Sequence, residues 1–483
     1  MTYHATLLSS IAVYRLSPFH PLAKYPGPIT LKLSRMWVYR MAKSGKRHEY
    51  IRTLHEIYHS DIVRIGPNEV SISDASAIGP VLGQSGLVKG PGWDGRVRYM
   101  ADRPLISWRD PVMHAKRRHN WNRGLSGPAI KVYEPVVGDR VVQMVDLALK
   151  QPGEVVDMVK LIKYFAFDIM GDMGFGGGSE LMRDGDTHGF LQAVIDGIDD
   201  SILSETFPWL AYYARNRLFD VIESAANRAK ERVLRSKGTQ DLFYYLSNED
   251  GNGKDTPPLE VVIPEGVVVS IAGSDTTSFS LNATIHLLIS HSSAYKRLQE
   301  EVDRFYPPGE NAVDTRYHSE MPYLDAVINE ALRLYPVLAS GSHRATQKEA
   351  VLINAWCIPP NTSVRVHTWS VHRDPRNFSP SSDSFWPERW LLANNQPCPD
   401  PKPSDFVHNT NAFHTFSFGP ANCTGKALAL REMKMLLCHM FQQMDMKFAE
   451  GYDPKDWDKD LKDAGVSMEV GMLPVICTPR HRT

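Results

Sequence analysis

The chain has 483 residues, and its 54 lysine and arginine residues against 55 aspartate and glutamate residues leave a net charge of −1. This balance lacks the basic surplus of dedicated nucleic-acid-binding proteins, and no apolar run approaches the ~18–20 residues that span a bilayer. A nucleic-acid-binding protein and a polytopic membrane protein are therefore excluded, whereas 42% hydrophobic and 23% charged residues are typical of a globular protein.

The first 25 residues form a separate N-terminal tail in our prediction. The apolar run from Leu7 to Tyr14 is too short to cross a membrane. It fits either a weak interfacial anchor or a frayed end that packs on the body of the protein. The rigid turn Tyr25-Pro26-Gly27-Pro28 separates this tail from the rest. Because the composition does not change beyond it, we predict a tail over residues 1–25, with a possible short membrane anchor, and one large domain over residues 26–483.

A few strands are expected within this domain. Residues 62–65 and 70–73 alternate in the manner of strands on either side of a Gly-Pro turn, and they predict a β-hairpin. Further strands are predicted at residues 351–353 and 364–368, on either side of a turn at Pro359-Pro360-Asn361.

Long helices dominate the remaining pattern. We predict helices over residues 131–149, 215–235 and 264–291, and Pro264 suits the first position of the last one. At about 1.5 Å per residue, this last helix crosses the whole domain. Its centre, residues 272–278, reads Ala-Gly-Ser-Asp-Thr-Thr-Ser, and most of these residue types are poor in a helix interior. Residue types that are unfavourable for the local secondary structure indicate a functional site at that place.

A shorter helix carries a pair of opposite charges. It opens at Pro322, closes at Tyr335-Pro336 and is otherwise apolar, but it contains Glu330 and Arg333. Alone, the Glu-x-x-Arg pattern is a weak signal, since such pairs commonly lie in solvent. On so apolar a helix we expect the pair to be buried, and a buried pair needs a third partner.

Cys423 differs from the other four cysteines, which have no neighbour at metal-ligand spacing. It follows Phe416 and Gly419, precedes Gly425, and lies just before a helix predicted over residues 426–441. The free N–H groups and the macrodipole at a helix N-terminus stabilise a thiolate and lower its pKa. A single thiolate cannot make a zinc site, but it can be the one axial protein ligand of a haem iron.

The pattern Phe-x-x-Gly-x-x-x-Cys-x-Gly, formed by Phe416, Gly419, Cys423 and Gly425, resembles the haem-binding signature of the cytochrome P-450 family. The resemblance covers nearly the whole chain, and Lys89-Gly90-Pro91-Gly92-Trp93 looks most like fungal microsomal members. It implies a mainly α fold with small β-sheets in a single large domain. It also implies haem b (iron protoporphyrin IX) as the cofactor, with Cys423 as the iron ligand and the other three signature residues around the haem.

The resemblance assigns a role to the unusual helix centre. Asp275 and Thr276 match the family's oxygen-activation motif, in which a carboxylate and a hydroxyl deliver protons in an otherwise dry pocket. The small residues Ala272 and Gly273 are expected to leave room for the oxygen.

The charge pair also has a counterpart in the family. Glu330 and Arg333 match a motif whose third partner is the arginine of a Pro-Glu-Arg sequence, here Arg389. This triad is expected to be structural and to hold the loop that presents the cysteine.

Three basic residues match the family's anchors for the haem propionates, namely His114, Arg118 and Arg344. One departure concerns the position two residues before the cysteine. The family usually has Arg or His there, and this chain has Ala421. One charge-assisted bond is therefore missing or comes from elsewhere, and this puts strong haem retention in doubt.

The implied function is that of a haem-thiolate monooxygenase. It would insert one atom of O2 into a lipophilic small molecule, in secondary metabolism or xenobiotic conversion, at the cytosolic face of the endoplasmic reticulum membrane. Electrons would come from a separate NADPH–cytochrome P-450 reductase, which would dock on Lys116, Arg117, Lys426 and Lys434. Substrate-facing segments are expected at residues 87–106, 195–209, 271, 279, 337–342 and 466–468.

Two alternatives remain open. The same fold also supports isomerisation, dehydration or peroxide-driven chemistry, and a non-catalytic haem-binding scaffold or sensor is a further possibility. The Asp275–Thr276 pair favours oxygen activation, and Ala421 is the one feature that favours a scaffold.

Overall fold

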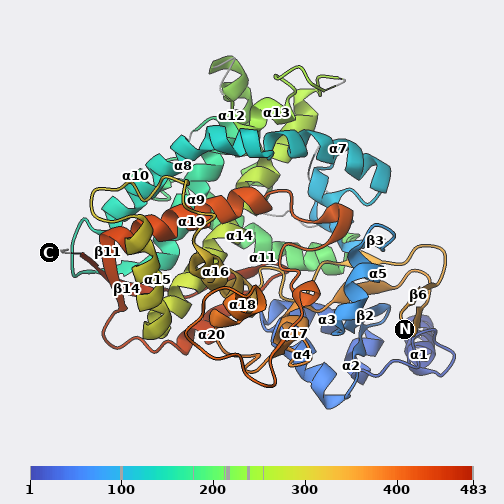
Figure 1. Ribbon diagram of the computed structural model, residues 1–483. Helices are drawn as coiled ribbons and strands as arrows, with labels where there is room; N and C mark the ends of the chain where they lie inside the picture. The colour runs from blue at the N-terminus through green and yellow to red at the C-terminus, as the bar shows by residue number, and fades with distance from the viewer. Residues whose placement is uncertain are drawn as a thin grey trace.

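The computed structural model describes residues 2–97, 100, 102–177, 179–210, 213, 218–235, 240–253 and 255–480. Figure 1 shows a body of helices, with the larger sheet and the N-terminus at one edge of the molecule and the C-terminus at the other. The mainly α fold with small sheets is confirmed.

The long helices form this body, and shorter ones connect or flank them. The long helices are α1 (Thr2–Leu16), α7 (Pro111–Gly124), α8 (Gly127–Ala148), α9 (Met158–Phe175), α11 (Phe190–Thr206), α12 (Leu218–Arg235), α14 (Leu259–Ser290), α15 (Ser292–Phe305), α16 (Pro322–Leu334) and α19 (Lys426–Gln443). The shorter ones are α2 (Ile29–Leu33), α3 (Arg35–Lys43), α4 (Arg47–Ile57), α5 (Ile78–Leu82), α6 (Gly92–Arg96), α10 (Leu181–Asp184), α13 (Leu242–Leu246), α17 (Thr368–Arg373), α18 (Glu388–Ala393) and α20 (Asp456–Asp460).

The strands form one larger sheet and several small ones. The larger sheet has the order β1 (Ile62–Gly66), β2 (Glu69–Ile72), β8 (Ser363–Val366), β5 (Arg344–Ala345) and β3 (Val88–Lys89). A three-stranded sheet has the order β11 (Met444–Phe448), β14 (Pro474–Pro479) and β4 (Val155–Asp157). Two-stranded pairs join β6 (Val351–Ile353) to β7 (Trp356–Ile358), β9 (Phe378–Ser379) to β10 (Val407–His408), and β12 (Leu461–Asp463) to β13 (Ser467–Glu469).

The strand predictions are confirmed in part. The hairpin around Gly66-Pro67 forms as β1 and β2, with Ile62 opposite Ile72. Residues 351–353 are a strand, but β6 pairs with β7 rather than with the strand that follows the turn. That later strand, β8, pairs in parallel with β2 and antiparallel with β5.

The long central helix begins earlier than predicted. It starts at Leu259 because Pro258, with extended backbone angles, serves as its N-cap, so Pro264 lies inside the first two turns. The first four N–H groups of a helix have no acceptor within it. Pro264 lies beyond these positions and has no N–H, so the helix loses one backbone hydrogen bond, the one to the carbonyl of Glu260. The predicted helix 131–149 lies within α8, and residues 215–217 of the predicted helix 215–235 lie outside the described residues.

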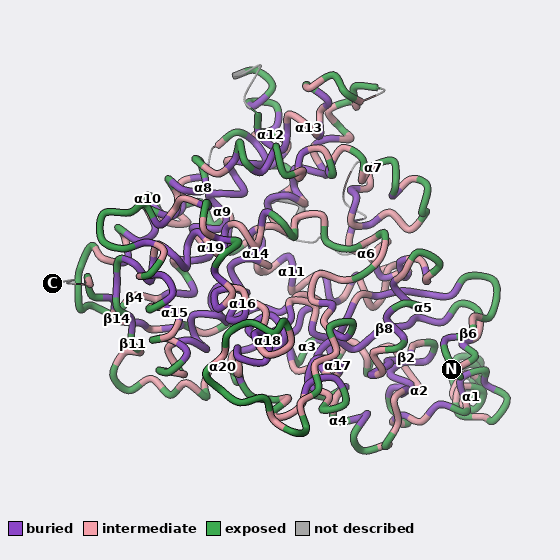
Figure 2. The backbone as a smooth tube through the Cα atoms, viewed as in Figure 1, coloured by how far each residue is buried: buried purple, intermediate pink, exposed green. Residues whose placement is uncertain are grey.

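The core is continuous around α14, which packs against α9, α16 and α19. Figure 2 shows this central region as mainly buried backbone. The contact with α9 is close, because a Cβ on Gly273 would lie 2.2 Å from Met170 Sδ. The sequence analysis expected Gly273 to leave room for oxygen, whereas the structure places Met170 of α9 there.

Asp168 joins α9 to the start of α10. It is fully buried, and its carboxylate accepts hydrogen bonds from Ser179 Oγ at 2.8 Å, Leu181 N at 2.8 Å and Met182 N at 2.9 Å. Asp168→Ala leaves these donors without partners, and we expect it to lower the free energy of unfolding by about 3 kcal/mol.

The matched control is Asp110→Ala, which removes an exposed cap that accepts from two backbone N–H groups of α7. We expect this control to cost about 1 kcal/mol, because water replaces the lost acceptor. Urea unfolding followed by circular dichroism measures both values, and equal losses would contradict the role of burial.

Candidate functional site

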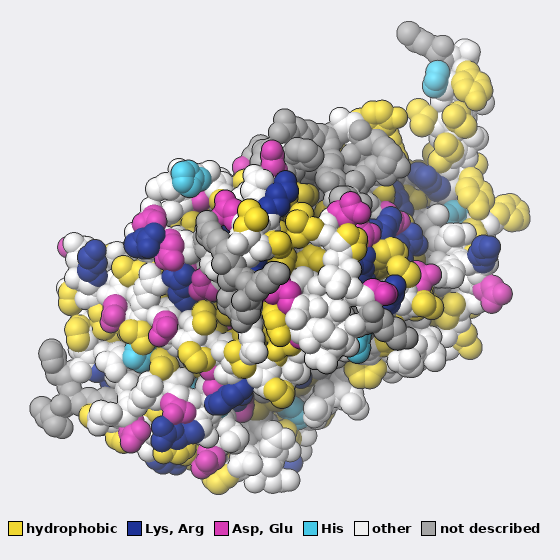
Figure 3. Space-filling view, turned by 90° about the horizontal axis from the view of Figure 1, so that it is seen from above, with side chains coloured by type: hydrophobic (Ala, Val, Ile, Leu, Met, Phe, Trp, Pro, Cys, Tyr) yellow, Lys and Arg dark blue, Asp and Glu magenta, His cyan; other side chains and the backbone are white. Residues whose placement is uncertain are grey.

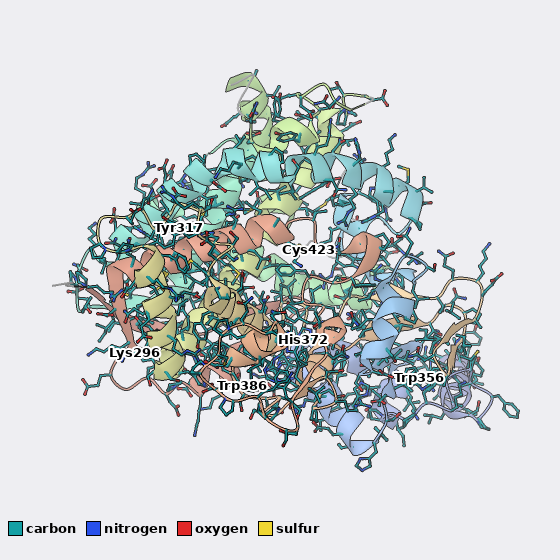
Figure 4. All side chains as sticks on the ribbon, in the orientation of Figure 1. Lys296, Tyr317, Trp356, His372, Trp386 and Cys423 are labelled. Atoms are coloured by element: carbon teal, nitrogen blue, oxygen red, sulfur yellow. The ribbon has the colours of Figure 1, made fainter. Side chains whose placement is uncertain are left out.

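Cys423 lies in a tight loop between a 3-10 turn, η5 (Gly419–Ala421), and the start of α19. Figure 4 shows it near the centre of the molecule, beside the first turn of that helix. The N–H of Cys423 donates to the carbonyl of Phe416 at 2.9 Å and closes the loop. Gly419 has φ +72°, and a Cβ there would lie 2.3 Å from the carbonyl oxygen of Leu82 in α5. Because other residues would clash, Gly419 lets the loop pack directly on α5.

Opposing effects act on the pKa of the Cys423 thiol. The residue is exposed to solvent, but many protein atoms surround its thiol at slightly longer range. Desolvation by these atoms raises the pKa of the thiol above its usual value. The N–H groups of Gly425 and Lys426 and the charge of Arg118 favour the thiolate. The lowered pKa predicted from the helix N-terminus is therefore not found in the protein alone, because burial outweighs these donors. A bound metal cation would reverse the balance, as it does for coordinating thiols generally.

The thiol has no companion ligands in the described part of the chain. No group of three or more His, Cys, Asp or Glu residues there could hold a metal ion. Cys423 is therefore suited to be the one protein ligand of a metal whose other ligands come from a cofactor, which is the arrangement of a haem iron.

One face of α14 borders a hollow. Val268, Ala272 and Thr276, spaced by four residues, are partly exposed, whereas most of their neighbours on the helix are buried. Because other elements pack along α14, we infer from this partial exposure a space beside these three residues, and we call it the hollow. The Thr276 hydroxyl donates to the carbonyl of Ala272 at 2.7 Å, and its oxygen keeps acceptor capacity toward that space.

Asp275 is next to Thr276 but lies in a different environment. It is buried, and its Oδ2 has no hydrogen-bond partner among the described residues. Burial raises the pKa of Asp275 to about 7, while Lys163 opposes the rise and Glu469 adds to it. Lys163 of α9 and Glu469 of β13 form a buried pair, with Nζ 3.5 Å from Oε2. A carboxyl group with a pKa near neutrality beside a hydroxyl is suited to proton transfer.

The three predicted propionate anchors belong to one basic cluster, which consists of Lys89, His114, Arg118 and Arg344. Lys89 of β3 was noted from the sequence only as part of the Lys89–Trp93 motif, and no role at the propionates was predicted for it. Burial, followed by the charges of Arg344 and Arg118, lowers the pKa of Lys89 to about 7. Burial, followed by the charges of Lys89, Arg118 and Arg344, lowers the pKa of His114 to about 4. Arg344 Nε is buried without a partner among the described residues. The cluster thus gathers positive charge in the interior.

The acidic group that acts on Lys89 forms no ion pair with this cluster in the described part of the chain. Glu265 of α14 accepts hydrogen bonds from Leu105 N at 3.0 Å and Trp121 Nε1 at 3.0 Å, and burial raises its pKa to about 7. Buried cations without an anionic partner are costly. The two carboxylates of a haem would fit this cluster, and its donor set matches what carboxylates require.

Arg118 joins the basic cluster to the cysteine loop. Its Nη1 donates to the carbonyls of Pro420 at 2.9 Å and Asn422 at 2.8 Å, and its Nη2 donates to Asn422 Oδ1. These two residues flank Ala421. The side chain that was predicted to bind a propionate therefore also fixes the loop around Cys423.

The structure brings the predicted triad together without access to solvent. Glu330, Arg333 and Arg389 are each 0% exposed. The Glu330 carboxylate accepts from Arg333 at 2.7 and 2.9 Å, from Arg389 Nε at 3.0 Å, and from N–H groups of Trp386 and Trp390. Burial alone would raise the pKa of Glu330, but the two arginines hold it at about 2.

His372 connects this triad to the cysteine loop. Its carbonyl accepts from Arg333 Nη1 at 2.7 Å, and its Nδ1–H donates to the carbonyl of Arg333 at 3.1 Å. Its Nε2 then accepts from the N–H of His414 at 3.2 Å, and the His414 carbonyl accepts from Ser417 N at 2.7 Å. Figure 4 shows His372 and Cys423 in the same central part of the molecule. The triad therefore reaches the loop through a continuous chain of hydrogen bonds.

The four basic residues predicted to receive a reductase differ in their surroundings. Arg117 pairs with Asp102, and Lys434 pairs with Asp325 at 2.7 Å. Lys116 and Lys426 are exposed. Neither of the latter two has an ion pair among the described residues, although Lys426 Nζ lies over the Phe416 ring, 5.5 Å from its centroid.

The predicted substrate-facing segments meet at a network of ion pairs that the sequence did not reveal. Glu205 at the end of α11 pairs with Arg96 of α6 and, at 2.6 Å, with Arg365 of β8. Arg47 of α4 pairs with Asp463 of β12 at 3.0 Å and lies 3.9 Å from Glu205. These residues lie far apart in the chain, so only the fold brings them together.

Single substrate-facing predictions have different outcomes. Ile271 is partly exposed beside the hollow, whereas Phe279 is fully buried in the core. Residues 98, 99 and 101 of the segment 87–106 lie outside the described residues.

Comparisons with known proteins agree with this site. A family model described as cytochrome P450 matches residues 24–471. The chain is 30% identical over 487 residues to cytochrome P450 monooxygenase FCK2 of Fusarium pseudograminearum, covering 98% of this chain and 85% of the relative. It is 30% identical over 460 residues to cytochrome P450 monooxygenase nodW of Hypoxylon pulicicidum, with coverages of 93% and 81%. It is 27% identical over 496 residues to tryprostatin B 6-hydroxylase of Aspergillus fumigatus, with coverages of 99% and 84%.

The triad makes a sharp prediction about stability. Glu330→Gln leaves two buried arginines without their counter-charge, and we expect the free energy of unfolding to fall by about 3–5 kcal/mol. The control is Glu56→Gln, which removes an exposed pair with Arg52 and costs less than about 0.5 kcal/mol. Chemical unfolding of both variants tests the difference. A loss in Glu330→Gln as small as in the control would show that the triad does not support the fold.

Proposed function

Because the chain belongs to the cytochrome P-450 family, whose relatives named above are monooxygenases, we propose that it is a haem-thiolate monooxygenase. It inserts one atom of O2 into a lipophilic small molecule, with haem b as its cofactor. The observation that carries this proposal is the bridge made by Arg118 between the Cys423 thiol and a basic cluster that forms no ion pair within the described residues. A single ligand that carries both a metal and a pair of carboxylates would complete both partial sites.

The residues of this chain divide the work of binding. Cys423 holds the iron, and Phe416, Gly419 and Gly425 shape the loop around it. His114, Arg118 and Arg344 hold the propionates. When bound, the haem supplies the activation of O2 and the transfer of one oxygen atom. Glu330, Arg333 and Arg389 keep the loop in place and take no part in the reaction.

Thr276 lies on the partly exposed face of α14 and Asp275 on its packed side, and both take part in proton supply in this proposal. The Thr276 oxygen accepts a hydrogen bond from a ligand or water in that space, while Asp275 exchanges its proton with the Lys163–Glu469 side of α14. Isomerisation, dehydration and peroxide-driven oxidation take up no net protons, whereas the reaction with O2 and reductase electrons does. The intact acid–hydroxyl pair therefore favours O2-dependent chemistry over these alternatives, and over a non-catalytic scaffold or sensor.

Electrons come from a separate NADPH–cytochrome P-450 reductase in this proposal. Lys116 and Lys426 are the exposed basic residues available for its acidic surface. The names of the fungal relatives, such as tryprostatin B 6-hydroxylase, support a role in secondary metabolism.

The N-terminal tail is proposed to attach the protein to the cytosolic face of the endoplasmic reticulum membrane. Helix α1 extends from the body, and Figure 3 shows its hydrophobic side chains uncovered. Tyr3, Leu8 and Val13 are each more than half exposed. In the described part of the chain, no helix has the length and apolar character needed to cross a membrane. The exposed apolar side chains of α1 are suited to interfacial attachment, as proposed for residues 1–25.

Thiolate ligation has a direct spectroscopic test. The reduced, carbon-monoxide-bound wild type is expected to show a strongly red-shifted Soret band, and Cys423→Ser is expected to lose it. Cys357→Ser, which changes an exposed cysteine, serves as the control and should keep the band. An unshifted band in freshly prepared wild type would overturn the monooxygenase proposal.

Proton supply predicts a dependence on pH. Since burial raises the pKa of Asp275 to about 7, its carboxyl carries a transferable proton below that pH and loses it above. We expect the fraction of NADPH electrons recovered in product to fall as the pH rises through about 7. In Asp275→Asn the group neither ionises nor donates an acidic proton, so this fraction should be low and independent of pH near 7. Parallel assays of NADPH, product and hydrogen peroxide measure it, and an inflection that persists in Asp275→Asn would assign it to another group.

A further inference from the structure

Lys89 and Arg344 lie opposite each other across a pair of short strands. The antiparallel register of β3 and β5 pairs Lys89 with Arg344. Both side chains are buried, at 8% and 5% exposure. Like charges placed directly opposite on a sheet destabilise it, and burial adds the cost of removing both from water. The fold therefore keeps an unfavourable pair at this place.

The hydrogen bonds of Lys89 do not account for its charge. Its Nζ donates to the carbonyls of Leu105 at 3.1 Å and Ile106 at 2.6 Å. An ammonium group has three donors, and the ring face of Trp93, whose centroid is 5.8 Å from Nζ, is an additional partner that carries no net charge. The ion pairs of the described residues include none with Lys89 or Arg344, and Glu265, which acts on Lys89, is itself held by two N–H donors. Two neutral acceptors leave the net charge in place, and the lowered pKa of Lys89 reports that cost.

Position 421 of the cysteine loop carries no cation of its own. Arg118 donates to the residues on both sides of Ala421, while Ala421 itself contributes only a methyl group. The charges of Arg118 and Arg344 both act on Lys89. The register of β3 and β5 places Lys89 beside Arg344, one of the residues expected to hold a propionate.

We propose that Lys89 binds a haem propionate and supplies the cation that Ala421 does not. This rests on the proposed function in that it requires a haem. It assigns to β3 a cofactor-positioning residue, and it predicts that haem is retained despite the departure at Ala421.

The first test is the rate at which haem leaves the full-length holoenzyme for an excess of apomyoglobin. We expect Lys89→Met, which keeps the aliphatic stem, to release haem at least about tenfold faster, since a charge-assisted bond is lost. Lys89→Arg should release it at nearly the wild-type rate. Lys116→Met removes an exposed lysine and serves as the control for the loss of one charge. An unchanged rate in Lys89→Met would overturn the proposal.

A second measurement separates contact with the propionate from a role in the fold. The full-length protein is reconstituted with haem and with haem dimethyl ester, whose propionates carry no charge. If Lys89 binds a propionate, Lys89→Met weakens binding of haem and has little effect on the ester. An equal effect on both would show that Lys89 only supports the backbone at Leu105 and Ile106, and would overturn the proposal.

Rescue from position 421 completes the test. Ala421→Arg in the Lys89→Met background should restore slow haem release, because it returns one cation to the same region. This double variant also decides the case in which Lys89→Met alone gives no folded haem protein: recovery supports the proposal, and no recovery overturns it. The carbon-monoxide spectrum of wild type reports thiolate ligation independently, so failure of the proposed function and failure of this inference give different results.

Discussion

Burial of one carboxylate between two arginines is the constraint on which the rest of the site depends. Glu330 is shut off from solvent, and its negative charge is tolerated because Arg333 and Arg389 bind it directly. The same arginines donate to backbone carbonyls of residues 372 and 380–384. A charge cluster on α16 and α18 thereby fixes loops that have little secondary structure of their own. His372 carries this order to the cysteine loop, so the position of one thiol depends on ion pairs in another part of the core.

The cofactor site itself is built from charges that the protein leaves uncompensated. Burial disfavours the Cys423 thiolate, while donors from the start of α19 favour it. The basic cluster holds several cations whose nearest acid is occupied elsewhere. Each half is unfavourable alone, and a ligand with a metal cation and two carboxylates relieves both. The uncompensated charges therefore lower the stability of the protein without its cofactor. Functional sites are where proteins commonly contain residues that are locally unfavourable.

Helix α14 separates two chemical environments. Its partly exposed face presents Ala272 and Thr276 to a hollow, while Asp275 lies in the packed interior beside the Lys163–Glu469 pair. Gly273 lets α9 approach closely, through Met170. The poor helix formers at the centre of α14 thus serve two purposes, close packing on one side and polar chemistry on the other. Sequence alone showed that the centre was unusual and did not distinguish the two.

The sequence by itself determined the family, the mainly helical fold, and those site residues that lie within a few positions of one another. Phe416, Gly419, Cys423 and Gly425 form a local pattern, and the burial of Glu330 with Arg333 followed from an apolar helix. These features depend on turn geometry, helix periodicity and local spacing, which a sequence carries directly.

Only the tertiary structure decided which distant residues meet and what environment they share. Lys89 enters the basic cluster through strand pairing with Arg344, and Glu205 joins arginines from three other elements. Burial, which no local pattern encodes, reversed the pKa expected for Cys423 and raised that of Asp275. Charge interactions and desolvation depend on distance in space, and the folded packing alone sets that distance.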